Sequence, residues 1–177
     1  HGTAVASVVG AVGNNAQGIA GVNWDVDIVS SAAAFDLSDV IDVFEDALTL
    51  RQQFNNSNGV NGAMVVSVTA SWGTPGVLAC DGFSYPLFHD MATAGILVIT
   101  SGPNEPTDLD VAPEYPSSCA LAEHLVVGSI GPLGQTPYAF GDNSVHLLAP
   151  GLDVPVADEF NNYQLADGNS FPIPHVA

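Results

Sequence analysis

The sequence Gly168-Asn169-Ser170-Phe171-Pro172-Ile173-Pro174-His175-Val176-Ala177 ends the chain and carries its most informative pattern. A serine that follows a glycine turn can be the first residue of a helix, where its hydroxyl is exposed beside backbone N–H groups without helical partners. Such N–H groups can bind a developing oxyanion. Prolines are tolerated in the first helical turn, because the N–H groups that they lack would be unpaired there. Taken alone, the stretch predicts either a nucleophile at a helix start or a surface loop ahead of a helix.

Two other stretches bear on this choice. The chain opens with HGTAVAS (residues 1–7), and GPNE (residues 102–105) follows an apolar run. Together with residues 168–177, they resemble three motifs of the subtilisin-like serine proteases (subtilases, peptidase family S8). The family forms are the histidine motif HGTHVAG, the oxyanion-asparagine segment AAGNE and the serine motif GTSMATPHVA. They occur in the family's order and span the whole chain.

The resemblance implies a catalytic apparatus. By it, Ser170 is the nucleophile, and His1 is the general base and then the general acid to the leaving amine. The Asn104 amide and the Ser170 backbone N–H would form the oxyanion hole. The family's triad Asp precedes the histidine motif, so we expect it upstream of His1. We expect a serine endopeptidase that cleaves protein or peptide substrates through an acyl-enzyme, without a cofactor, and we expect residues 1–177 alone to be inactive.

Further segments match the family less directly. The SWG tripeptide after an apolar run resembles a segment that lines the subtilase substrate cleft, and the residues before the oxyanion asparagine would shape the same cleft. The residues that the resemblance assigns to substrate binding are Ser71, Trp72, Gly73, Ser101 and Gly102. Six departures from the catalytic motifs bear on specificity. Ala4 and Pro103 replace His and Gly in the first two motifs. In the serine motif, Asn169 replaces Thr, and Phe171, Pro172 and Ile173 replace Met, Ala and Thr.

The turn at residues 13–18, with the apolar segment after it, resembles the subtilase loop that binds a structural calcium ion. By that match, Asn15 would give a side-chain oxygen, and Gln17 and Ile19 their carbonyl oxygens. Calcium takes six to eight oxygen ligands, and the family's other ligands lie upstream of the histidine motif. The alternative is a plain Asn/Gly turn, and the sequence leaves both open.

The chain has two cysteines, Cys80 and Cys119. The segment YPSSC (residues 115–119) resembles the YPASC segment of many secreted bacterial subtilases, whose cysteine pairs with one shortly after the SWG segment. The resemblance therefore implies a Cys80–Cys119 disulfide, an oxidising compartment and a secreted, extracellular protein. Two free buried thiols are the alternative.

Apolar runs alternate with amphipathic segments along the chain, which predicts right-handed βαβ crossovers. We expect an α/β fold with a three-layer, mostly parallel sheet and helices on both faces, which lacks the N-terminal Asp strand and the C-terminal end. Residues 1–177 would form a single partial catalytic domain. The expected helices cover residues 3–12, 38–54 and 85–94, and the expected strands cover residues 27–33, 63–71, 96–101 and 124–129.

The charge narrows the classes of partner. A net charge of −18, with one Arg and no Lys, repels nucleic acid and anionic membrane surfaces, and no apolar run is long enough to span a bilayer. We expect a monomer, and the composition suggests a salty habitat in which repulsion between the protein's own charges is screened.

A non-catalytic binding module on the subtilase fold is the alternative function. An α/β-hydrolase would need a Gly-x-Ser-x-Gly pentapeptide, which is absent.

Overall fold

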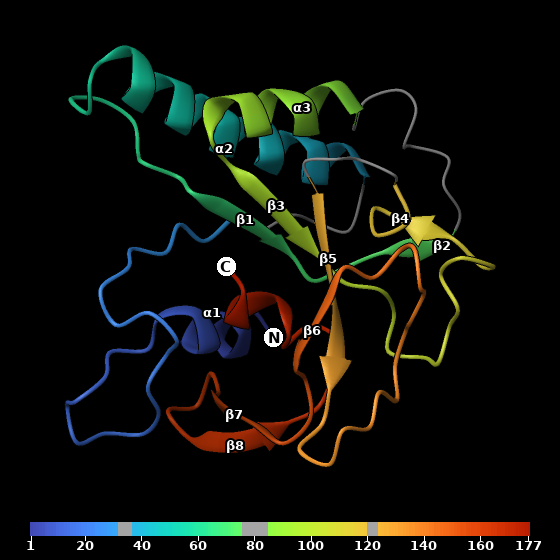
Figure 1. Ribbon diagram of the computed structural model, residues 1–177. Helices are drawn as coiled ribbons and strands as arrows, with labels where there is room; N and C mark the ends of the chain where they lie inside the picture. Colours follow the sequence, from blue (N-terminus) through green and yellow to red (C-terminus); the bar gives the residue numbers. More distant parts are fainter. Residues whose placement is uncertain (32–36, 76–84, 120–123) are drawn as a thin grey trace.

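Four short strands form a parallel sheet at the centre of the structure, a computed structural model that describes residues 1–31, 37–75, 85–119 and 124–177 (Figure 1). In spatial order they are β1 (Ser67–Ala70), β3 (Leu97–Thr100), β5 (His124–Ile130) and β6 (Leu147–Pro150). Each neighbouring pair is parallel. The carboxyl ends of all four strands therefore meet at one edge, where open α/β sheets place their sites.

The sheet is covered on both faces. Helices α2 (Leu37–Asn56) and α3 (Tyr85–Ala94) lie on one side, and α1 (Gly2–Gly10) and the short 3₁₀ helix η2 (Ile173–His175) lie on the other (Figure 1). Strand β3 shows why this arrangement forms, because successive side chains point to opposite faces. Val98 joins the core cluster under α2 and α3, whereas Ile99 packs with Ile173 of η2. This arrangement confirms the expected three-layer α/β fold.

Two small antiparallel ribbons complete the described structure. Strand β2 (Thr74–Pro75) pairs with β4 (Glu114–Tyr115), and β7 (Val154–Ala157) pairs with β8 (Tyr163–Ala166). Val154 and Val156 of β7 are buried against α1 while Pro155 between them is exposed. The strands expected from the sequence did not include residues 154–157 or 163–166. Pro155 is tolerated within β7 because this strand has a free edge.

Some predicted boundaries are wrong. Residues 27–31 form no strand, and Ile28 and Val29 are exposed there; residues 32–33 of that predicted strand lie outside the described part. A strand needs a partner for its backbone groups, and residues 27–31 pair with none of the described strands. Helix α1 ends at Gly10 with Ala11 as its C-cap, rather than at Val12. Helix α3 has the predicted bounds.

The chain's single Lys or Arg side chain links the helical layer to the sheet. Arg51 of α2 donates hydrogen bonds from Nε to the carbonyl oxygen of Ala94 (3.0 Å) and from Nη1 to that of Val65 (2.8 Å). These acceptors lie at the end of α3 and just before β1, so the contact is at the amino ends of the strands.

Among the described helices, none is long and apolar enough to cross a membrane.

Candidate active site

The three residues that the sequence assigns to catalysis are carried by three different segments. His1 is the N-cap of α1, Asn104 follows the carboxyl end of β3, and Ser170 lies in the turn before η2. Helix η2 packs against α1, β1 and β6, so the two ends of the chain lie side by side (Figure 1). The His1 ring lies 6.3 Å from the ring of Phe171, centroid to centroid. Tertiary packing thus brings the first residue and the serine motif to one place.

A tight turn presents Ser170. The Phe171 N–H donates to the carbonyl oxygen of Gly168 at 3.2 Å, so Ser170 is the third residue of a four-residue turn. Gly168 has φ +154°, a backbone conformation that residues with a side chain rarely adopt. Helix η2 begins at Ile173, three residues after the serine. Of the two alternatives left open by the sequence, a helix start at Ser170 is therefore wrong, and the chain instead turns at 168–171 ahead of the helix.

The surroundings of Ser170 are partly polar. The Ser71 hydroxyl donates to the Ser170 carbonyl oxygen at 3.3 Å, which links the end of β1 to the serine turn. Ser170 itself is half-buried and His1 is exposed. In the part of the chain that the structure describes, no hydrogen bond joins the His1 ring to the Ser170 hydroxyl. Their segments are held together instead through Phe171, which packs in one cluster with Val8 of α1.

The amide of Asn104 has a defined direction. Its Oδ1 atom accepts a hydrogen bond of 2.7 Å from the backbone N–H of Asn169. A backbone N–H can only donate, so the oxygen of the amide must face it, and this settles which end of the side chain is which. The Nδ2 group then points elsewhere and makes no hydrogen bond within the described residues. Asn104 thus offers an unused N–H donor next to the serine turn, as an oxyanion hole requires.

The residues assigned to the cleft follow β1 and β3. The ring of Trp72 lies 5.7 Å from that of Tyr115 at an angle of 52°, and Gly73 after it is exposed. Ser101 is buried. Gly102 has no room for a side chain, because a Cβ atom there would lie 2.6 Å from the Cβ of Ala139. These segments lie at the same sheet edge as Asn104.

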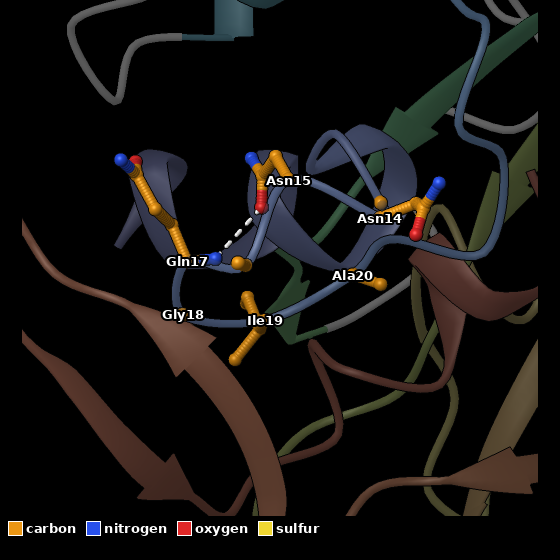
Figure 2. Close-up of a pocket in the computed structure, with 8 residues that line it drawn as sticks. Asn14, Asn15, Gln17, Gly18, Ile19 and Ala20 are labelled. Atoms are coloured by element: carbon orange, nitrogen blue, oxygen red, sulfur yellow. Dashed lines mark hydrogen bonds between the residues drawn. The ribbon is translucent and has the colours of Figure 1, made fainter.

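The predicted calcium loop borders an open hollow of about 270 Å³ that is lined by residues 13–20 (Figure 2). Figure 2 shows the side-chain oxygen of Asn15 turned toward the backbone N–H of Gln17, which donates to it at 2.9 Å. The loop offers only neutral oxygens, and no group of three His, Cys, Asp or Glu side chains that could hold a metal occurs among the described residues. With the carbonyls of Gln17 and Ile19, the loop fits part of a calcium shell, so the calcium site stays a prediction.

Only one of the two cysteines of the predicted disulfide lies in the described part of the chain. Cys119 is buried after β4, whereas Cys80 lies among residues 76–84, outside the described part of the chain. The bridge between them stays a prediction.

Sequence reasoning missed one residue at the site. Asn169 was noted only as a departure from the family's threonine, but its side chain is buried and hydrogen-bonded to Ser129, Gly102 and Pro103. No local sequence signal links these positions, because Ser129 lies 40 residues and Gly102 lies 67 residues from Asn169 in the sequence.

Comparison with known proteins finds relatives among the proteases. The chain is 27% identical over 186 residues to "Subtilisin-like protease 2" of Plasmodium falciparum, which covers 99% of this chain and 13% of that protein. It is 29% identical over 194 residues to the "Extracellular basic protease" of Dichelobacter nodosus, which covers all of this chain and 30% of that protein. A solved structure described as proteases from Pseudoalteromonas arctica superposes with a TM-score of 0.78 at 23% identity, over 100% of this chain and 56% of that one.

The chain thus spans less than a third of the length of these two curated relatives and a little over half of that solved structure. The model of the subtilase family, Peptidase S8, matches residues 1–177. The chain therefore belongs to the subtilase family.

Proposed function

We propose that this chain carries the nucleophile, the general base and the oxyanion hole of a serine endopeptidase. The observation that carries the proposal is the hydrogen bond from the Asn169 N–H to the Oδ1 of Asn104. It turns the Asn104 amide so that a free N–H donor lies beside the serine turn. A binding module would have no use for such a donor next to an exposed histidine and a serine.

In the proposed reaction, the Ser170 hydroxyl attacks the carbonyl carbon of the scissile bond while His1 takes its proton. The negative oxygen that develops is held by the Asn104 Nδ2 group and the Ser170 backbone N–H. His1 then gives the proton to the leaving amine, and an acyl-enzyme on Ser170 remains. Water, activated by His1, hydrolyses this ester and releases Ser170.

The reaction needs a group that orients His1. In a triad, a carboxylate fixes the tautomer of the histidine and stabilises its positive charge. Within the described residues, no carboxylate forms a hydrogen bond with the His1 ring. The proposal assigns this role to an aspartate that precedes His1 in the full-length gene product.

The substrates that we propose are proteins or peptides, and the site of action that we propose is extracellular. The relative from Dichelobacter nodosus is described as an extracellular protease, which supports this location. The net charge of −18 supports the absence of nucleic acid and anionic membranes from the set of partners.

A fluorophosphonate probe tests the proposal, because it labels only serines that are activated as nucleophiles. The full-length gene product should be labelled at Ser170 and should hydrolyse a peptide amide. Ser170→Ala should abolish both signals, and Ser57→Ala, which changes a serine at the far end of α2, should keep them. Unchanged hydrolysis by Ser170→Ala would contradict the proposal, and a folded protein with neither labelling nor hydrolysis would favour the binding module.

A further inference from the structure

The side chain of Asn169 is buried directly behind the proposed oxyanion hole. It is 1% exposed, and every polar atom of its amide has a partner. Its Oδ1 accepts a hydrogen bond of 2.7 Å from the Ser129 hydroxyl. Its Nδ2 donates to the carbonyl oxygen of Gly102 at 3.0 Å and to that of Pro103 at 3.3 Å. A buried amide that is fully satisfied in this way has one well-defined position.

These hydrogen bonds join three segments of the chain. Ser129 is near the end of β5, Gly102 and Pro103 immediately precede Asn104, and Asn169 immediately precedes Ser170. The same residue also holds Asn104 from its backbone, since the Asn169 N–H donates to Oδ1 of Asn104. One residue therefore fixes the main chain that leads into Asn104, the direction of the Asn104 side chain and the start of the serine turn.

Gly151 leaves room for the hydrogen bond between Ser129 and Asn169. A Cβ atom at Gly151 would lie 2.2 Å from the Ser129 hydroxyl oxygen, so the absence of a side chain at Gly151 lets Ser129 reach Asn169. The Gly168 N–H donates to the Gly151 carbonyl oxygen at 2.9 Å, which holds the serine turn against the end of β6.

We infer that Asn169 is a positioning residue of the oxyanion hole, and that it acts through Asn104 and the backbone of residues 102–103. The inference rests on the proposed function. An asparagine suits the role because its amide supplies two N–H donors and an acceptor oxygen, whereas a threonine hydroxyl supplies one donor. A threonine at this position could not donate to both carbonyls, so the oxyanion segment would be held less firmly.

The consequence for catalysis is a selective loss of transition-state stabilisation. Displacement of a catalytic group by about 1 Å can cost about 100-fold in rate, and loss of the asparagine donor itself costs about 10²–10³-fold. We expect Asn169→Ala to lower kcat on a peptide amide by about 10- to 100-fold, with KM nearly unchanged. Asn169→Asp should also lower kcat, because it turns an oxygen toward the two carbonyls while keeping the partner of Ser129.

The experiment uses the full-length gene product and a double-mutant cycle. Asn169→Ala is measured in the wild-type background and in the Asn104→Ala background. If Asn169 acts through Asn104, its substitution should cost little more once that amide is gone. A peptide boronic acid gives a second readout, because its tetrahedral adduct places an oxygen in the oxyanion hole. Its inhibition constant should rise in parallel with the loss of kcat, while binding of a product peptide should stay the same.

Arg51→Met is the matched control. It also removes two hydrogen bonds to backbone carbonyls, but at the opposite end of the strands. It should lower the melting temperature without changing kcat. If Asn169→Ala does not fold, Ser129→Ala and Asn169→Thr carry the same test, since each removes part of the network without an ionisable group.

The outcomes separate the two proposals. Equal losses from Asn169→Ala in both backgrounds, or wild-type kcat in all the Asn169 variants, would overturn the positioning role and leave the protease function standing. If Ser170→Ala kept the peptidase activity of the wild type, both the proposed function and this inference would be overturned.

Discussion

The backbone N–H of Asn169 donates a hydrogen bond of 2.7 Å to the Oδ1 atom of Asn104. The two residues are 65 positions apart in the sequence, yet this contact fixes the direction of the side chain that the proposed mechanism needs most. Gly168 allows the turn before Asn169, because its φ of +154° is a backbone conformation that residues with a side chain rarely adopt.

Replacement of the Asn104 amide should reduce the rate of the chemical step. Asn104→Ala removes the donor, and Asn104→Asp keeps the shape and the acceptor for Asn169 but places a negative oxygen where the oxyanion forms. We expect kcat to fall about 10²–10³-fold for Asn104→Ala, and further for Asn104→Asp. Steady-state kinetics on a peptide amide measures both. A change confined to KM would mean that Asn104 only binds the substrate.

Acid should destabilise the fold through His124. Its Nε2 lies 2.6 Å from the Thr100 hydroxyl oxygen in the core, and burial, helped by the nearby His146 and opposed by the Cys119 backbone, lowers the pKa of His124 to about 4. The folded state therefore keeps the imidazole neutral, while the unfolded chain binds a proton near pH 6.5. The neutral imidazole of His124 therefore stabilises the folded state fully above about pH 6.5. This stabilisation is lost as the pH falls toward 4, which lowers the free energy of unfolding by about 3 kcal/mol.

Urea unfolding between pH 4 and pH 7 measures this effect when the wild type is compared with His124→Gln. Glutamine does not titrate and can still hydrogen-bond to Thr100. The wild type should lose more stability than the variant across this range, whatever the carboxylates contribute to both. Parallel stability curves for the two proteins would contradict the assignment.

Salt should stabilise the protein. The net charge is −18, and Arg51, the only Lys or Arg side chain, donates to backbone carbonyls rather than to a carboxylate. Repulsion between carboxylates in the folded state should fall as the Debye length shortens to about 3 Å at 1 M salt. The melting temperature should therefore rise between low and molar NaCl. Sucrose at equal osmolality is the control for preferential exclusion, and a flat response to NaCl would remove the idea of a salty habitat.

We propose that the loop at residues 13–20 contributes oxygens to a calcium site. If it does, millimolar calcium should raise the melting temperature of the full-length gene product by binding to the folded state, and EDTA should reverse the effect. Asn15→Ala should reduce the calcium-dependent shift, whereas Asn143→Ala, at an exposed asparagine remote in sequence, should not. An identical melting temperature with calcium and with EDTA would mean that the Asn15–Gln17 contact is a plain turn.

The predicted Cys80–Cys119 bridge can be tested without further structural information. A bridge that closes a loop of about 40 residues contributes roughly 4 kcal/mol in the chain-entropy model. A reductant should therefore lower the melting temperature of the wild type but not that of Cys119→Ser. Non-reducing peptide mapping should recover the two cysteines as one cross-linked peptide. Complete alkylation of both thiols in denaturant without a reductant would show that the bridge does not form.

Much of the architecture could be predicted because it depends on local patterns. The apolar run at 96–101 contains β3, buried on both faces, and the amphipathic segment at 85–94 is helix α3 with the same bounds. The three motifs pointed to the subtilase family, which the family match over residues 1–177 confirms, whereas the catalytic roles of His1, Asn104 and Ser170 stay a prediction. Residue type and spacing carry this information along the chain, so no knowledge of tertiary contacts is needed to use it.

Only the tertiary structure decided which of these residues meet, and how. Strand β7 pairs with β8 despite Pro155 because the ribbon has a free edge, where the missing N–H of a proline costs little. The side chain of Asn169 finds its partners on β5 and after β3. A hydrogen bond depends on the position and direction of both groups, and groups so far apart in sequence acquire these only when the sheet has formed. For that reason the sequence by itself determined the family and the layers and pointed to the residues proposed to react, whereas the direction of the Asn104 amide and the proposed role of Asn169 depended on the folded chain.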